Sequence, residues 1–264
     1  MLKIMGGSIR HVQPDDIYAT ATPVPTSTHF PFAHGMLLKE TERLIKDMDY
    51  EILESAHALG KEDLTYFGMY RLKSHVADTE TWDPLVGIRN SHDKTMAAGL
   101  TCGEHVTVCS NLMFSGAFTF TRKHTRHGFT ETLDGMAETF TKLPAIDKYI
   151  SERIDTFKTI PVEDDRDVSK FILECAGRNL IAPNTTVGVW NEWLDPTHDD
   201  FKDRTLWSLV NSFTTVHGDK NYSPFRIARD TLKLNEFITE TWAEELVELD
   251  SPLLKSEDRE DYTE

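Results

Sequence analysis

Two short clusters in this sequence hold the residue types that could bind an anion. The first covers residues 89–93, and Asn, Ser and Asp within it are common in turns because their side chains bond to nearby backbone. An ordinary turn is therefore one interpretation. The other is that Arg89, Asn90 and His92 present donors to a phosphate or a base edge, with Lys94 directly after the cluster as a further cation. His92 could also act as a general base, although adjacent strand residues point to opposite faces and Asp93 is no ready-made partner.

The second cluster is residues 121–127, in which three cations and two histidines alternate with threonine. In a strand, Arg122, His124 and Arg126 share one face and Lys123 lies on the other. Such a segment could contact successive phosphates. The alternative is an edge strand that carries charge to prevent pairing with another sheet.

Other candidate groups near the clusters each have an ordinary structural alternative. Phe118 and Phe120 could stack on bases beside the cations, but phenylalanine is more often packed in a core. Cys109 could be reactive in an electropositive, partly exposed setting, or it could be a buried, inert thiol. The histidines and Asp93 are suitable metal ligands. No pair of them has a recognised chelate spacing, so we predict no metal and no cofactor.

The charge distribution singles out the same region. The chain of 264 residues has 28 Lys and Arg against 44 Asp and Glu, a net charge of −16. Residues 71–127 carry seven cations, five acids and five of the 11 histidines, so this stretch is +2 and the remainder is −18. Because phosphate contacts dominate affinity for duplex DNA, so acidic a chain is poorly suited to coating a duplex. An acidic remainder would instead keep anions away from every surface but this one.

The sequence lacks the short motifs that identify several common enzyme classes. The sequence has no phosphate-binding loop motif, dinucleotide fingerprint, nucleophile elbow or zinc-protease helix motif. Its three cysteines, Cys102, Cys109 and Cys175, have no CxxC spacing and form no disulfide framework. With no export signal and no apolar run of about 18 residues, we expect a cytoplasmic protein that does not contact a membrane.

The apolar spacing predicts an α+β fold. A helix is expected from Met36 to Met48, and the chain is then expected to form about five strands, at residues 50–59, 63–73, 85–90, 98–109 and 116–124. Beyond residue 130 only helices are expected: a long apolar stripe over 133–157 that Pro144 kinks or splits, then 165–176, 201–217 and 235–248. Because strands run together instead of alternating with helices, the sheet should be antiparallel, with helices on one side.

The same pattern divides the chain into three parts. Residues 1–30 are expected to be an extended arm, since they are rich in Thr, Pro and His and lack helical or strand periodicity. Residues 31–250 form the single α+β domain, which is sheet-rich over 50–127 and helical over 130–250. Residues 251–264 form an acidic flexible tail.

Three motifs resemble a family of phage- and plasmid-encoded proteins of unknown function. They are GIRNSHDK at residues 87–94, VCSN at 108–111 and RKHT at 122–125, and the helical segment 207–214 also fits. The resemblance spans roughly residues 80–235. It implies a mobile-element protein working inside a bacterial host, and it implies no established activity.

Three functions remain open from the sequence. The favoured one is an accessory protein that binds nucleic acid, single-stranded rather than duplex, in replication or recombination. A homo-oligomer could align its basic patches. Its predicted contacts are Arg89, Asn90, His92, Lys94, Arg122, Lys123, His124 and Arg126. The second is an acidic interaction protein that modulates a host factor. The third, less favoured, is an enzyme acting on a nucleotide or nucleic acid through His92 and His124.

Overall fold

The computed structural model describes residues 2, 4, 9–76, 82–106, 111–113, 119–218 and 224–246. Its strands are β1 (Ile9–His11), β2 (Ile52–Gly60), β3 (Thr65–Leu72), β4 (Trp82–Ser91), β5 (Ala98–Val106), β6 (Asn111–Met113) and β7 (Thr119–Arg122). Its α-helices are α1 (Pro14–Ala19), α2 (His34–Asp47), α3 (Gly128–Thr141), α4 (Leu143–Thr159), α5 (Asp165–Gly177), α6 (Thr186–Leu194), α7 (Leu206–Gly218) and α8 (Pro224–Thr241). The predicted α+β class is confirmed.

All described strands belong to one antiparallel sheet with the order β1-β2-β3-β4-β5-β6. The predicted hairpin around Gly60 is present, since Gly60 pairs with Thr65. β6 and β7 both pair with β5, at opposite ends: Glu104 lies opposite Met113, and Ala98 lies opposite Arg122. β7 therefore lies beside the end of the sheet from which the β4–β5 turn projects.

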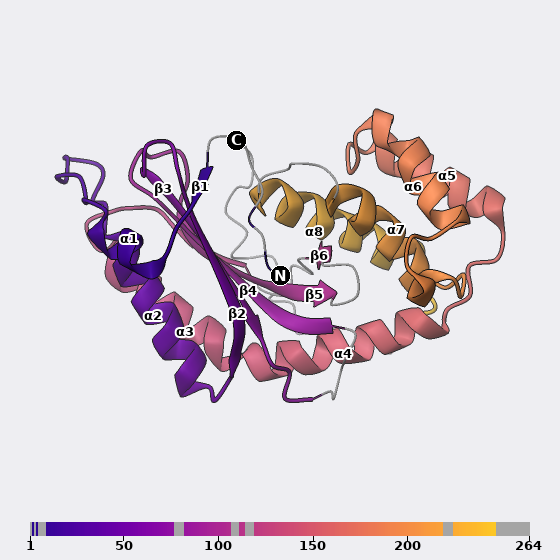
Figure 1. Ribbon diagram of the computed structural model, residues 1–264, viewed down its shortest axis with the longest axis horizontal. Helices are drawn as coiled ribbons and strands as arrows, with labels where there is room; N and C mark the ends of the chain where they lie inside the picture. Colours follow the sequence, from indigo (N-terminus) through magenta and orange to yellow (C-terminus); the bar gives the residue numbers. More distant parts are fainter. Residues whose placement is uncertain are drawn as a thin grey trace.

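The two faces of the sheet are covered differently. Alternate strand residues such as Tyr66, Val86 and Leu100 join the main hydrophobic core on one face. Helices α2, α3 and α4 contact the sheet and lie along one side of it in Figure 1, while α7 and α8 lie beside β6. The other face has a smaller apolar cluster, in which Leu2 and Ile4 pack with strand residues.

The helical half follows the sequence signals closely. Pro144 lies in the first turn of α4, where a missing N–H costs no hydrogen bond, and it separates α3 from α4 as predicted. Asp164 caps α5 by accepting a hydrogen bond from Arg166 N at 2.8 Å. None of the described helices is both long and apolar enough to span a bilayer.

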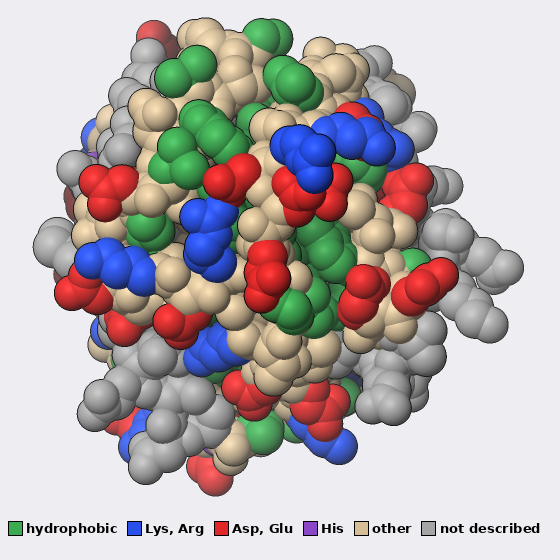
Figure 2. Space-filling view, turned by 90° about the vertical axis from the view of Figure 1, so that its right-hand side faces the viewer, with side chains coloured by type: hydrophobic (Ala, Val, Ile, Leu, Met, Phe, Trp, Pro, Cys, Tyr) green, Lys and Arg blue, Asp and Glu red, His purple; other side chains and the backbone are tan. Residues whose placement is uncertain are grey.

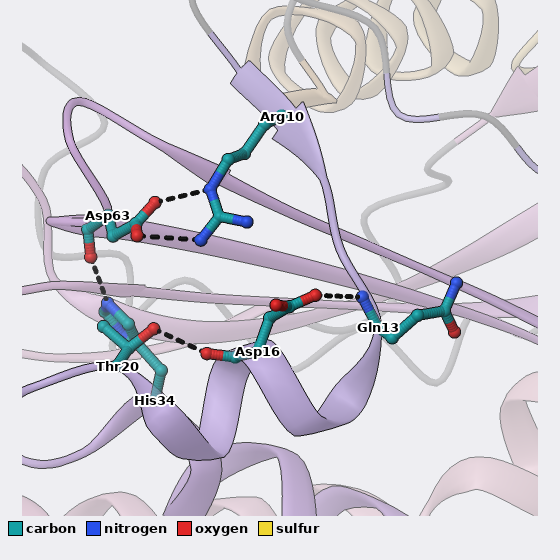
Figure 3. Close-up of polar contacts among 6 residues, drawn as sticks. All are labelled: Arg10, Gln13, Asp16, Thr20, His34 and Asp63. Atoms are coloured by element: carbon teal, nitrogen blue, oxygen red, sulfur yellow. Dashed lines mark hydrogen bonds and ion pairs between the residues drawn. The ribbon is translucent and has the colours of Figure 1, made fainter.

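The N-terminal arm is more structured than the sequence indicates. Residues 9–11 form β1 against the end of β2, and α1 follows with Pro14 at its start. The acidic first turn of α1 suits a helix N-terminus, and Asp16 accepts a hydrogen bond from Gln13 N at 3.0 Å (Figure 3). A three-residue strand and a six-residue helix are too short to produce a detectable period. Residues 107–110, 114–118 and 251–264, where we predicted strand ends and the acidic tail, lie outside the described residues.

Candidate nucleic-acid interface

The eight predicted contact residues separate into a buried group and a more exposed group. Asn90, His92 and His124 are buried, with 0%, 5% and 5% of their surfaces exposed. The cations of β7 and of the turns are exposed. These two groups have different roles.

Asn90 is the centre of a buried hydrogen-bond network between the sheet and residues 29–34. Its amide Nδ2 donates to the Phe32 carbonyl at 3.0 Å and contacts His34 Nδ1 at 2.9 Å. Its Oδ1 lies 2.7 Å from His124 Nε2. Both ends of this amide, the Nδ2 donor and the Oδ1 acceptor, therefore have partners within the protein.

Four histidines surround that amide. The rings of His34 and His92 stack with centroids 3.8 Å apart and an angle of 5° between their planes. His92 Nε2 is 2.9 Å from the Phe32 carbonyl, and His29 Nε2 is 3.2 Å from the His92 carbonyl. The Phe32 ring stacks on His124 at 5.0 Å. We call His29, His34, Asn90, His92 and His124 the histidine network.

Burial lowers the pKa of three of these rings, those of His34, His92 and His124, and so favours their neutral form. Desolvation, with repulsion from His92, lowers the pKa of His34 to about 3. Desolvation likewise lowers the pKa of His124 to about 4, and it lowers the pKa of His92. The expectation that Asn90, His92 and His124 present donors to an anion is therefore corrected. Their hydrogen-bonding capacity serves the docking of residues 29–34.

The histidine network is also joined to the β2–β3 turn. His34 Nε2 is 3.1 Å from the Asp63 carbonyl, and the Asp63 carboxylate accepts two hydrogen bonds from Arg10, at 2.9 and 2.8 Å (Figure 3). Thr20 closes the end of α1 by donating to the Asp16 carbonyl at 3.0 Å. β1, α1 and the start of α2 are thus fixed at one end of the sheet.

Four of the predicted cations are exposed at this same end, and we call them the basic edge: Lys94, Arg122, Lys123 and Arg126. Lys94 lies in the β4–β5 turn. Arg122 is the last residue of β7 and pairs with Ala98 next to that turn, and Lys123 and Arg126 follow β7. Arg122 is 4.0 Å from Glu131, an exposed ion pair. Among the described residues, Lys94, Lys123 and Arg126 have no carboxylate within ion-pair distance.

The arm lies between the two parts of the basic edge. His29 contacts the carbonyl of His92 in the β4–β5 turn, and Phe30 N donates to the His124 carbonyl at 2.8 Å. The Arg126 guanidinium lies over the partly exposed Phe30 ring, 5.7 Å from its centroid. Phe30 is thus an aromatic ring at the basic edge that the sequence analysis did not single out.

Arg89 is less exposed than these cations. It is partly buried on β4, and a Cβ on Gly99 would come within 3.1 Å of its Nε. Thr121 Cγ2 would be equally close, so the absent side chain at Gly99 lets Arg89 lie across β5 toward β7. Arg89 is on the opposite face from Asn90, because neighbouring strand residues alternate.

The remaining candidates have structural roles or lie outside the described residues. Phe120 packs against the core and α3, where a Cβ on Gly135 would be 2.1 Å from its ring. Cys102 and Cys175 are buried free thiols, and burial raises the pKa of each to about 12. Phe118 and Cys109 are not among the described residues. Within the described ranges, no three His, Cys, Asp or Glu side chains are grouped to hold a metal ion.

Sequence reasoning missed the arm side of the network. His29, Phe32 and His34 lie about 60 residues from Asn90 and His92, and no periodicity links the two segments. The only available signal was composition, because two histidines and two phenylalanines occur within residues 29–34. No family model, no curated protein and no solved structure matches this chain.

Proposed function

We propose that this protein binds single-stranded nucleic acid along the basic edge, as an accessory protein of phage or plasmid replication or recombination in a bacterial cytoplasm. The observation that carries the proposal is the pairing of Ala98 with Arg122, which places the Lys94 turn beside Lys123 and Arg126. Four cations from two separate segments thereby face solvent at one end of a chain whose net charge is −16. Elsewhere, the acidic surface disfavours an anionic polymer.

The geometry fits a flexible strand better than a duplex. Phosphates would contact Lys94, Arg122, Lys123 and Arg126, while the partly exposed Phe30 ring offers a face for stacking on a base. Single strands can bend around a protruding turn and expose their bases to such a ring, whereas bases in a duplex are already stacked. Four phosphate contacts predict that log K falls against log salt with a slope of about −3, at roughly −0.7 per contact on a single strand.

The test is a salt-titrated binding assay with single-stranded and duplex oligonucleotides of equal length, with native mass determination for oligomers. Charge reversal by Arg122→Glu with Lys123→Glu should weaken single-strand binding by at least about tenfold and roughly halve the salt slope. The matched control is Lys148→Glu with Lys170→Glu, which makes the same charge change at exposed positions on α4 and α5. Equal losses in both double variants, or no binding by the parent protein, would refute the proposal.

A second candidate function is an interaction with a protein partner through the helical half. Leu173 of α5 and Val187 of α6 are 65% and 66% exposed, and Leu194 is 48% exposed. Figure 2 shows the face on the right-hand side of Figure 1, where hydrophobic side chains are interspersed with Asp and Glu and also with Lys and Arg. A host factor with a basic, partly apolar surface is the partner this face would suit. One double variant distinguishes the two candidates, because charge reversal at Arg122 and Lys123 should weaken the first activity and spare the second.

An enzymatic role through His92 and His124 has less support. The two rings do converge on the histidine network, but both are buried and each holds its Nε2 against a protein oxygen. A substrate could reach them only after residues 29–33 had moved.

A further inference from the structure

The histidine network contains a defined set of protons. The Asp63 carbonyl can only accept, so His34 must carry its proton on Nε2, and its Nδ1 accepts from the Asn90 amide. Asn90 Nδ2 also donates to the Phe32 carbonyl, so its Oδ1 is the acceptor that faces His124 Nε2–H. The hydrogen bonds from His34 therefore require a neutral ring with one particular tautomer.

The two remaining rings follow the same logic. His92 donates its Nε2–H to the Phe32 carbonyl, and His29 donates its Nε2–H to the His92 carbonyl. Three hydrogen bonds hold residues 29–33 to the sheet. Asn90 and His92 each donate to the Phe32 carbonyl, and His29 donates to the His92 carbonyl. Residues 29–33 are thus attached to the sheet largely by hydrogen bonds that involve histidine.

An added proton has no favourable place in this network. On His34 it would occupy Nδ1 and oppose the Asn90 N–H, and the charge would lie 3.8 Å from the stacked His92 ring. The nearest carboxylates are engaged elsewhere: Asp63 binds Arg10, and Asp93 binds Lys61 and Thr95. Lys123 and Arg126 flank His124 along the chain, and Tyr66 is uncharged beside His34. Among the described residues, no carboxylate accepts a hydrogen bond from any ring of the network.

We propose that the histidine network is an acid-sensitive latch, in which protonation releases residues 29–33 from the sheet while the rest of the domain stays folded. The release is local because Phe32 is the one arm residue among 20–33 that joins the main core, while Phe30 is partly exposed and Val24 is 86% exposed. This inference does not depend on nucleic-acid binding. If both proposals hold, release would uncover the strip between Lys94 and Lys123.

The expected size of the effect follows from the linkage between protonation and release. A ring whose pKa is about 4 when docked, as for His124, and about 6.5 when released favours release as the pH falls between those values. From pH 7 to pH 5, each such ring shifts the release equilibrium by about 20-fold.

Hydrogen exchange of the full-length protein at pH 7, 6 and 5 tests the latch, with each rate expressed relative to the intrinsic rate at that pH. Protection of residues 29–33 should fall at least tenfold more than protection of β3. His124→Gln keeps a donor for Asn90 but cannot be protonated, so it should remove about 20-fold of this pH dependence. His127→Gln, at an exposed ring three residues away, is the matched control and should retain it.

A measurement on the parent protein covers the case in which His124→Gln does not fold. Nitrogen-15 NMR of the imidazoles at pH 7 should show His34, His92 and His124 neutral, with their protons on Nε2. A charged ring or the other tautomer would overturn the proposal. So would equal loss of protection in the arm and β3, or an unchanged pH dependence in folded His124→Gln.

Discussion

Arg153 of α4 donates a hydrogen bond to Glu104 of β5 although the two side chains are only 2% and 0% exposed. The same guanidinium reaches α8, where it donates to Asn235 Oδ1 at 3.0 Å. It also lies 5.6 Å from the centre of the Phe157 ring. One buried charge pair therefore ties the far part of the sheet to two helices of the C-terminal half.

Removing one member of this pair should destabilise the protein strongly. Glu104→Ala leaves the Arg153 guanidinium buried without its carboxylate, so we expect a loss of about 3–5 kcal/mol in the free energy of unfolding. The double variant Glu104→Leu with Arg153→Met removes both charges at similar volume and should recover most of that loss. Denaturant titration of the two variants and the parent measures both values. A double variant that is no more stable than Glu104→Ala would contradict this account.

Gly135 of α3 is required by the Phe120 ring. A Cβ at this position would lie 2.1 Å from Phe120 Cε2, so Gly135→Ala must displace the ring or the helix. Alanine is normally better than glycine in a helix by up to about 1 kcal/mol, but overpacking costs about 1–3 kcal/mol. We expect a net loss in thermal stability. Gly177→Ala, where nothing lies within 4 Å of the added Cβ, is the control and should be neutral or stabilising.

Most of the fold could be predicted because its signals are local. The β2–β3 hairpin, the division of α3 from α4 at Pro144 and the cap at Asp164 each depend on residues within a few positions of one another. β1 was missed because its order comes from pairing with Gly60, about 50 residues away. Two predicted helix starts were also wrong. The helix expected from residue 201 begins at Leu206, after a short 3-10 turn over Asp199–Phe201, and the helix expected over 235–248 is α8, Pro224–Thr241.

The candidate site was predictable in composition but not in exposure. Strand alternation indicated that His92 and Asp93 face opposite sides, but it could not show which side residues 29–34 cover. Asn90, His92 and His124 have the residue types of a ligand site, and the same types satisfy a buried backbone such as that of Phe32. Distinguishing the two uses required the position of residues 29–34, which only the tertiary structure supplies.

The turn between β2 and β3 contains three successive residues in the left-handed region: Lys61, Glu62 and Asp63, with φ of 49°, 57° and 67°. A side chain other than glycine costs about 1–2 kcal/mol in this conformation. Glu62 is exposed, so Glu62→Gly should relieve that cost without losing packing. We expect Glu62→Gly to be about 1 kcal/mol more stable than Glu62→Ala, which removes the charge but keeps the Cβ. Chemical denaturation of both variants compares them directly, and equal stabilities would contradict the prediction.

Acid should destabilise the domain through its buried histidines as well as release the arm. Desolvation lowers the pKa of His57, which bonds Tyr66 at 3.0 Å in the sheet, to about 4. Because the folded pKa lies below the unfolded value of about 6.5, the unfolded chain binds the proton first, and stability is lost as pH falls from about 6.5 toward 4. One such group contributes a loss of about 2 kcal/mol between pH 7 and pH 5.

His57→Gln should make the loss smaller by that amount in urea titrations at the two pH values, whereas His11→Gln, at an exposed ring, should not. Parallel losses in His57→Gln and the parent would contradict the prediction, because they would show that His57 binds its proton equally in the folded and unfolded states.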